Sequence, residues 1–171
     1  FAETYKGHGT DRAIVGGILG YETDDPRIIE ALEEAENLNL KISYRRMDLG
    51  PVHPNTARIN FLEDGEIVCS VTGSSIGGGQ VRIVEVDGID TNLDGKAWSV
   101  IMTYKDRPKM IFDLTSRVAD YNLNIATMSV TRKDEEATLI AEFDDGICES
   151  LHQAISEIEG IHTLRLVPQI I

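Results

Sequence analysis

Near the start of the chain, apolar positions recur at the spacing of helices. One predicted helix runs to Gly20 from Thr10 or Asp11, either of which can cap it, and its apolar members are Ile14, Val15, Ile18 and Leu19. A second helix begins at Asp24-Asp25-Pro26, where acidic residues meet the positive end of the helix dipole and proline suits the first turn. Its apolar residues are Ile28, Ile29, Leu32 and Ala35.

Alternating apolar and polar positions then predict strands. One candidate strand carries three apolar residues: Ile42, Tyr44 and Met47. Residues 57–61 alternate cleanly, and the turn dipeptide Asp64-Gly65 would join them to residues 67–71 as a hairpin. A further strand covers residues 81–86, and the polar, Gly-containing residues 87–95 read as a short linker.

The second segment has the order β-α-β-β-α-β. Its predicted elements are strands 99–104, 125–131, 137–143 and 161–167, a helix over 108–122, and a helix that ends at Gly160. This order is the ferredoxin-like arrangement. The sequence therefore predicts an α+β protein with two domains, residues 1–90 and residues 96–171.

Composition excludes several classes of partner. A formal net charge of −13 opposes binding to nucleic acid or to an anionic membrane surface. The sequence has no apolar run of membrane-spanning length and no secretory signal, which predicts a soluble cytoplasmic protein. Its two cysteines, Cys69 and Cys148, form no CxxC motif, so we expect inert thiols and no metal site.

The glycine-rich residues 72–80 resemble a phosphate-binding loop only weakly. They lack the Gly-Lys-Ser/Thr ending and lead into a strand, which favours a strand connection or a small-anion loop. Ser74 and Ser75 could still donate hydrogen bonds to a carboxylate. Arg58 is one of four predicted strand arginines that could face a carboxylate ligand or, alternatively, pair with the chain's own acidic residues: Arg45, Arg46, Arg58 and Arg82.

His8 and His53 lie in polar, turn-rich sequence, where packing gives no reason for an imidazole. Solvent-exposed loop histidines are the alternative interpretation, and a metal site would need more ligands than these two. A nucleophile, a base and an orienting group do not occur together at a recognisable spacing. The chain alone is therefore not expected to be a complete enzyme.

Three stretches carry a family resemblance: residues 4–11 with His8-Gly-Thr-Asp11, then His53-Pro-Asn-Thr56, then residues 71–88 with the glycine run. Their order resembles the beta chains of iron–sulfur L-serine dehydratases over essentially the whole chain. In that family an allosteric-substrate-binding domain precedes an ACT domain. The family also carries an upstream Ser-Ser-Ser-His-Thr segment that this sequence lacks, which implies that the N-terminal part of the first domain is missing here.

The resemblance implies an activity and partners. The family enzyme deaminates L-serine to pyruvate and ammonia without pyridoxal phosphate. A [4Fe-4S] cluster acts as its Lewis acid and is bound by the alpha (catalytic) subunit, so this chain is expected to bind no cofactor itself. The implied partners are that alpha subunit, L-serine, and a second copy of this chain through the ACT domain.

The resemblance also implies site residues. His8, His53 and Asn55 are expected to contribute to an active site shared with the alpha subunit, and the expected ligand-binding residues are Ser74, Ser75, Arg58, Asp106 and Asn124. Lys109 replaces the usual glycine of the ACT turn, which implies an altered effector site. The alternatives are a free-standing amino-acid sensor, the regulatory tail of a D-3-phosphoglycerate dehydrogenase, or an ACT interaction module whose first segment only mediates assembly.

Overall fold

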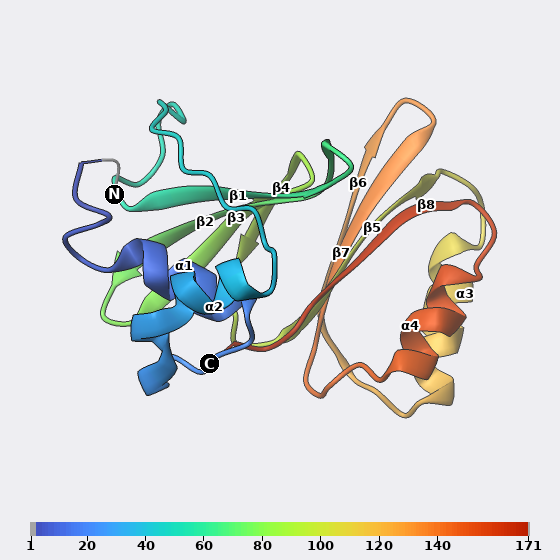
Figure 1. Cartoon of the computed structure of the whole chain (residues 1–171). Helices are drawn as coiled ribbons and strands as arrows, with labels where there is room; N and C mark the ends of the chain where they lie inside the picture. Colours follow the sequence, from blue (N-terminus) through green and yellow to red (C-terminus); the bar gives the residue numbers. More distant parts are fainter. Residues whose placement is uncertain (1–2, 171) are drawn as a thin grey trace. The chain divides into compact units, whose positions relative to one another are not determined.

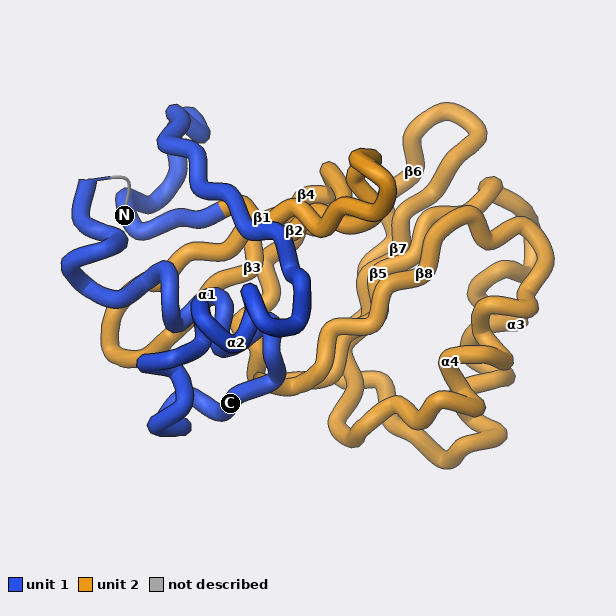
Figure 2. Tube along the Cα trace, viewed as in Figure 1, with its two compact units in different colours: residues 1–57 blue, residues 58–171 orange. Residues whose placement is uncertain are grey.

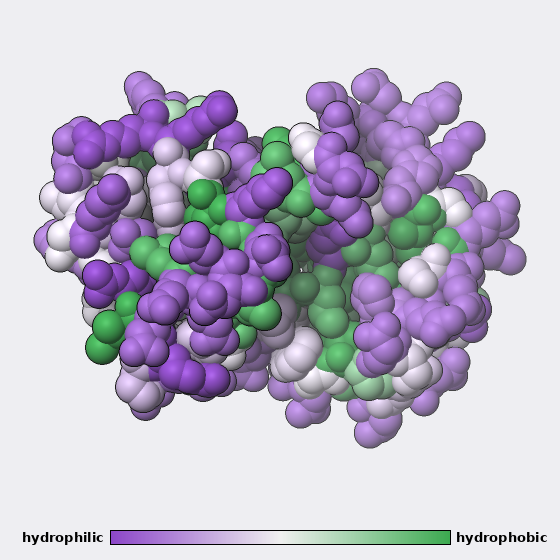
Figure 3. Space-filling view, viewed as in Figure 1, coloured by the Kyte–Doolittle hydropathy of each residue, from purple (hydrophilic) through white to green (hydrophobic). Residues whose placement is uncertain are grey.

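The computed structural model describes residues 3–170 and divides the chain into two compact units, residues 1–57 and residues 58–171 (Figures 1 and 2). Within those described residues, no helix is long and apolar enough to cross a membrane. Hydrophilic residues cover most of the visible surface, as the acidic composition leads us to expect (Figure 3).

The first unit contains α1 (Thr10–Ile18), a 3₁₀ helix η1 (Pro26–Glu30) and α2 (Ala31–Asn37). The two predicted helices are therefore present, and the second one opens as a 3₁₀ turn. Asp25 caps that turn by accepting a hydrogen bond from the Arg27 N–H at 2.8 Å. Three buried side chains close a small core between the helices: Val15, Ala31 and Ala35.

Two expectations for this unit are wrong. Neither Thr10 nor Asp11 caps α1, because the helix begins after Gly9, whose φ of +67° takes the chain into the helix without a side-chain cap. The strand expected around Ile42, Tyr44 and Met47 does not form. Those three side chains are exposed, so they do not pack against the face of a sheet and their alternation stabilises no strand.

The second unit opens with a four-stranded sheet of β1 (Thr56–Glu63), β2 (Glu66–Gly77), β3 (Gln80–Val86) and β4 (Ile89–Leu93), in that order. The predicted hairpin turn is present, and both of its residues, Asp64 and Gly65, have positive φ. β2 extends into the glycine-rich stretch. The linker expected at residues 87–95 is wrong, since β4 occupies most of it and pairs with β3 around an Asp87-Gly88 turn.

The remaining residues form the predicted βαββαβ fold: β5 (Trp98–Lys105), α3 (Met110–Asp120), β6 (Ile125–Lys133), β7 (Glu136–Phe143), α4 (Glu149–Ser156) and β8 (Ile161–Val167). The antiparallel sheet has the order β6-β7-β5-β8, and both helices cover one of its faces (Figure 1). The core between helices and sheet includes Met102, Leu114, Leu139, Phe143 and Leu151. The expected ferredoxin-like fold is confirmed.

The two sheets of the second unit join through an apolar cluster and one ion pair. The cluster is built around the buried residues Ile83, Val86, Leu93 and Ile101. Beside it, the Asp87 carboxylate accepts hydrogen bonds from Ser70 N–H at 2.8 Å and from Arg165 Nε at 2.6 Å. Arg165 also donates to the Val68 carbonyl at 2.7 Å. The carboxylate of a single turn residue thus connects β2, the β3–β4 turn and β8.

The ionisation of Asp87 follows from these contacts. Burial opposes its charge, but the hydrogen bond from Ser70 N–H and the pairing with Arg165 outweigh burial and lower the pKa of Asp87. A lowered pKa in the folded state means that the stabilisation is fully present above the unfolded pKa, near 4, and is lost as the pH falls through the folded value.

We predict that Asp87→Asn lowers the free energy of unfolding at neutral pH by about 1 kcal/mol, a small figure because both ionic side chains are partly exposed. The difference in the free energy of unfolding between variant and wild type should shrink once the pH falls below about 4, because the carboxylate of the unfolded wild type then takes up a proton before that of the folded protein does. Urea denaturation measures the free energy of unfolding, with Asp90→Asn, at an exposed position of β4, as the control. A difference in the free energy of unfolding that stays constant as the pH falls below about 4 contradicts this account of Asp87.

Candidate functional site

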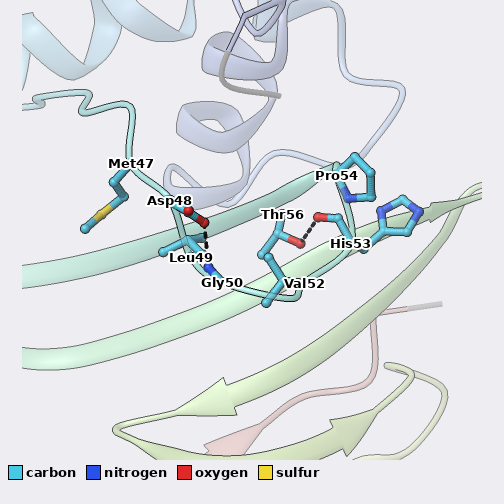
Figure 4. Close-up of a pocket in the computed structure, with 8 residues that line it drawn as sticks. All are labelled: Met47, Asp48, Leu49, Gly50, Val52, His53, Pro54 and Thr56. Carbon is cyan, nitrogen blue, oxygen red and sulfur yellow. Dashed lines mark hydrogen bonds between the residues drawn. The ribbon is translucent and has the colours of Figure 1, made fainter.

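The loop between the helices and the first sheet encloses a shallow hollow (Figure 4). Local hydrogen bonds shape it: Asp48 Oδ1 accepts from Gly50 N–H, and Val52 N–H donates to the Gly50 carbonyl, both at 2.8 Å. The residues that line it are Met47, Asp48, Leu49, Gly50, Val52, His53, Pro54 and Thr56.

His53 and Asn55 are brought together in this loop. The backbone N–H of Asn55 donates to His53 Nδ1 at 3.2 Å. Thr56 Oγ1 donates to the His53 carbonyl at 2.6 Å, as Figure 4 shows. Both His53 and Asn55 are exposed. The imidazole is therefore held by its Nδ1 edge while its Nε2 edge is accessible to a ligand.

His8 lies in the turn before α1, in the same compact unit, and its side chain is exposed. Its N–H donates to the Thr4 carbonyl at 3.1 Å. Across residues 3–170, no hydrogen bond or ion pair joins the His8 side chain to His53 or Asn55. The structure thus pairs two of the three expected active-site residues directly and leaves the third in a separate exposed turn of the same compact unit.

The turn that carries His8 is tied to the irregular segment 40–50 by contacts that the sequence did not reveal. The rings of Tyr5 and Tyr44 stack with centroids 5.5 Å apart, and Tyr44 OH donates to the Asp11 carbonyl at 3.3 Å. Arg46 pairs with Glu3 at 3.1 Å. Burial, and next the nearby Asp11 charge, raise the pKa of Tyr44, so its hydroxyl remains a donor at neutral pH.

Among the expected ligand-binding residues of the first sheet, Arg58 already has a carboxylate partner. Its guanidinium donates to both Glu85 carboxylate oxygens at 3.0 Å and to Thr72 Oγ1 at 3.0 Å. Ser74 is buried and Ser75 half-buried within β2. The glycine run is the end of that strand and a turn in which Gly77, Gly78 and Gly79 all have positive φ.

The residues expected to bind an effector at the ACT turn are also engaged within the chain. Asp106 pairs with Arg132 at 3.3 Å, and the Asn124 side-chain amide donates to the Asp144 carboxylate. Lys109 caps α3 with φ +70°, the left-handed conformation that glycine adopts without strain. Lys109 therefore places a side chain at the position where the resemblance implies a glycine with an open backbone.

The two thiols lie in different surroundings. Burial raises the pKa of the half-buried Cys69 thiol, whereas a hydrogen bond with Ser150 lowers the pKa of the exposed Cys148 thiol at the start of α4. In the described part of the chain, no three His, Cys, Asp or Glu side chains are grouped so that they could hold a metal ion.

Comparison with known proteins finds a family model and relatives that match nearly the whole of this chain. Residues 98–163 match the ACT domain model. A probable L-serine dehydratase beta chain of Bacillus subtilis (strain 168) is 38% identical over 164 residues, which cover 94% of this chain and 74% of the relative. The L-serine dehydratase beta chain of Peptoniphilus asaccharolyticus is 36% identical over 170 residues, which cover 98% of this chain and 77% of that relative.

A D-3-phosphoglycerate dehydrogenase of Synechocystis sp. (strain ATCC 27184 / PCC 6803 / Kazusa) matches less of the chain. It is 30% identical over 94 residues, which cover 54% of this chain and 17% of the dehydrogenase. The likeness to the dehydratase beta chains therefore extends over nearly the whole sequence, whereas the likeness to the dehydrogenase stops at about half.

Proposed function

We infer that this chain, which belongs to the family of L-serine dehydratase beta chains, completes an enzyme that converts L-serine to pyruvate and ammonia. The beta-chain relatives support a partner alpha chain that supplies the rest of the active site. We place the enzyme in the cytoplasm, where reducing conditions keep thiols such as Cys69 and Cys148 unpaired. On this view residues 1–90 serve substrate binding, and residues 96–171, which contain the matched ACT segment, serve assembly and regulation.

An iron–sulfur cluster does not fit this chain. A [4Fe-4S] cluster needs several thiolate ligands close together, and the sequence has only Cys69 on β2 and Cys148 at the start of α4. We therefore assign the [4Fe-4S] cluster to the alpha chain, where it would supply Lewis acidity.

His8, His53 and Asn55 are this chain's contribution to the shared site. The observation that carries this proposal is the exposed His53–Asn55 pair, because its imidazole is oriented by a backbone hydrogen bond and packs into no core. An imidazole and a side-chain amide can donate to a carboxylate, and the amide oxygen can accept from an ammonium group. L-Serine carries both of those charged groups.

The other expected ligand-binding residues are secondary in this proposal. A substrate carboxylate would have to displace Glu85, whose two carboxylate oxygens both accept hydrogen bonds from Nη2 of Arg58. Ser74 and Ser75 lie on β2 of the same sheet. Asp106 and Asn124 would serve an effector only after their own partners had separated.

We predict that His8→Ala, His53→Ala and Asn55→Ala each lower kcat/KM for L-serine by about 10-fold or more in the enzyme reconstituted with its alpha chain, because each removes a hydrogen bond to a charged substrate. Pyruvate release under anaerobic conditions measures the change, alongside iron content and subunit assembly. His162→Ala, on β8 and paired with Glu136, is the matched control and should be unaffected. Unchanged turnover in all three variants refutes the assignment.

We also propose that two copies associate through their ACT domains. The sheet order leaves β6 and β8 as edge strands, whose unpaired backbone groups favour pairing with another chain. Light scattering at micromolar concentration should give the mass of a dimer, because association covers those edges. A monomer mass at that concentration contradicts the proposal.

A further inference from the structure

The hydrogen bond between Asn55 and His53 fixes where the imidazole carries its proton. Asn55 N–H points at His53 Nδ1 with a separation of 3.2 Å, and a backbone N–H can only donate. Nδ1 must therefore present its lone pair and carry no proton. A neutral imidazole has one N–H, so the proton of His53 resides on Nε2.

This arrangement is local and built into the sequence. The ring accepts from the N–H two residues along, the pattern by which short polar side chains stabilise turns. Thr56 Oγ1 closes the same turn on the His53 carbonyl at 2.6 Å. Within residues 3–170, His53 Nε2 makes no hydrogen bond, so its N–H is available to a ligand.

We propose that His53 acts as a fixed hydrogen-bond donor, through Nε2–H, to the carboxylate of the amino-acid substrate, and that it is not the base that removes a proton. The inference rests on the proposed function of the loop as part of a serine site. In the neutral ring Nε2 has no free lone pair. Protonation at Nδ1 would require the Asn55 N–H bond to break.

The choice of the carboxylate follows from the chemistry of the substrate. An amino acid at neutral pH offers its carboxylate as the strong acceptor, whereas its ammonium group only donates. Arg58, the cation expected to bind a ligand at the first sheet, is paired with the carboxylate of Glu85. A neutral donor that has no acid bonded to it is therefore well suited to receive a carboxylate in this acidic protein.

Three substitutions at one position separate a donor from a base. Gln places an amide N–H near the position of Nε2, Asn reaches only the position of Nδ1, and Ala removes both. We expect His53→Ala to raise KM for L-serine by about 10- to 100-fold with a smaller loss in kcat, because the bond is made in the ground state and in the transition state alike. His53→Gln should recover most of that loss, and His53→Asn should resemble His53→Ala.

Competitive inhibition tests the substrate group that is bound. Inhibition by a small carboxylate such as 3-hydroxypropanoate should weaken in His53→Ala by about the factor seen in KM. Inhibition that is unchanged in the variant would overturn the assignment of the carboxylate as the acceptor.

The nitrogen that carries the proton can be read in the isolated full chain. ¹⁵N NMR of the labelled imidazole should show a protonated Nε2 and an unprotonated Nδ1, with the His53 signals identified by their loss in His53→Gln. A proton on Nδ1 would overturn the inference. So would a His53→Gln variant as impaired as His53→Ala with kcat reduced about 100-fold or more, the signature of a lost proton transfer. Wild-type kinetics in all three variants would instead refute the proposed site itself.

Discussion

The carboxylate of Asp87 is the polar contact that links the two sheets of the second unit. It lies in a turn with positive φ, accepts from Ser70 on β2, and pairs with Arg165 on β8, so it joins the two sheets at one point. Around it, an apolar cluster that includes Val86 and Ile101 buries the same junction. This junction explains why the compact division of the chain falls after Ala57 and not after the first sheet.

The excess of acidic residues shapes what the surface can bind. With 29 acidic and 16 basic residues, own-chain carboxylates are paired with Arg58 at the first sheet and with Arg132 beside the ACT turn. Any ligand carboxylate must compete with them. On the proposed function, the loop of His53 differs, because a backbone hydrogen bond orients an imidazole that can donate to a ligand carboxylate.

The sequence predicted much of the fold because the relevant signals are local. The ACT helices and strands followed from strict periodicity, and the Asp64-Gly65 turn followed from a dipeptide with known geometry. The strand expected around Tyr44 failed because alternation says nothing about whether a partner strand exists. That side chain instead stacks on Tyr5, 39 positions earlier, a pairing that no local pattern encodes.

The candidate site was predicted in part for the same reason. His53 and Asn55 stood out because polar turn sequence gives an imidazole no packing role, and a bond over two residues holds them together. The pairings of Arg58 with Glu85 and of Asn124 with Asp144 depend on strand register or on packing, so spacing along the chain could not reveal them. The Asp87-Gly88 dipeptide was the one available signal for β4, since it is a hairpin turn of the kind recognised at Asp64-Gly65.

Whether serine deamination requires this chain is decided most directly by pyruvate release from L-serine under anaerobic conditions. The proposed alpha chain is assayed alone and after addition of an equimolar amount of this chain. We predict that neither chain releases pyruvate alone and that the mixture does, since on the proposed function each chain holds part of the active site. An alpha chain that turns over L-serine equally well without this chain would contradict the account.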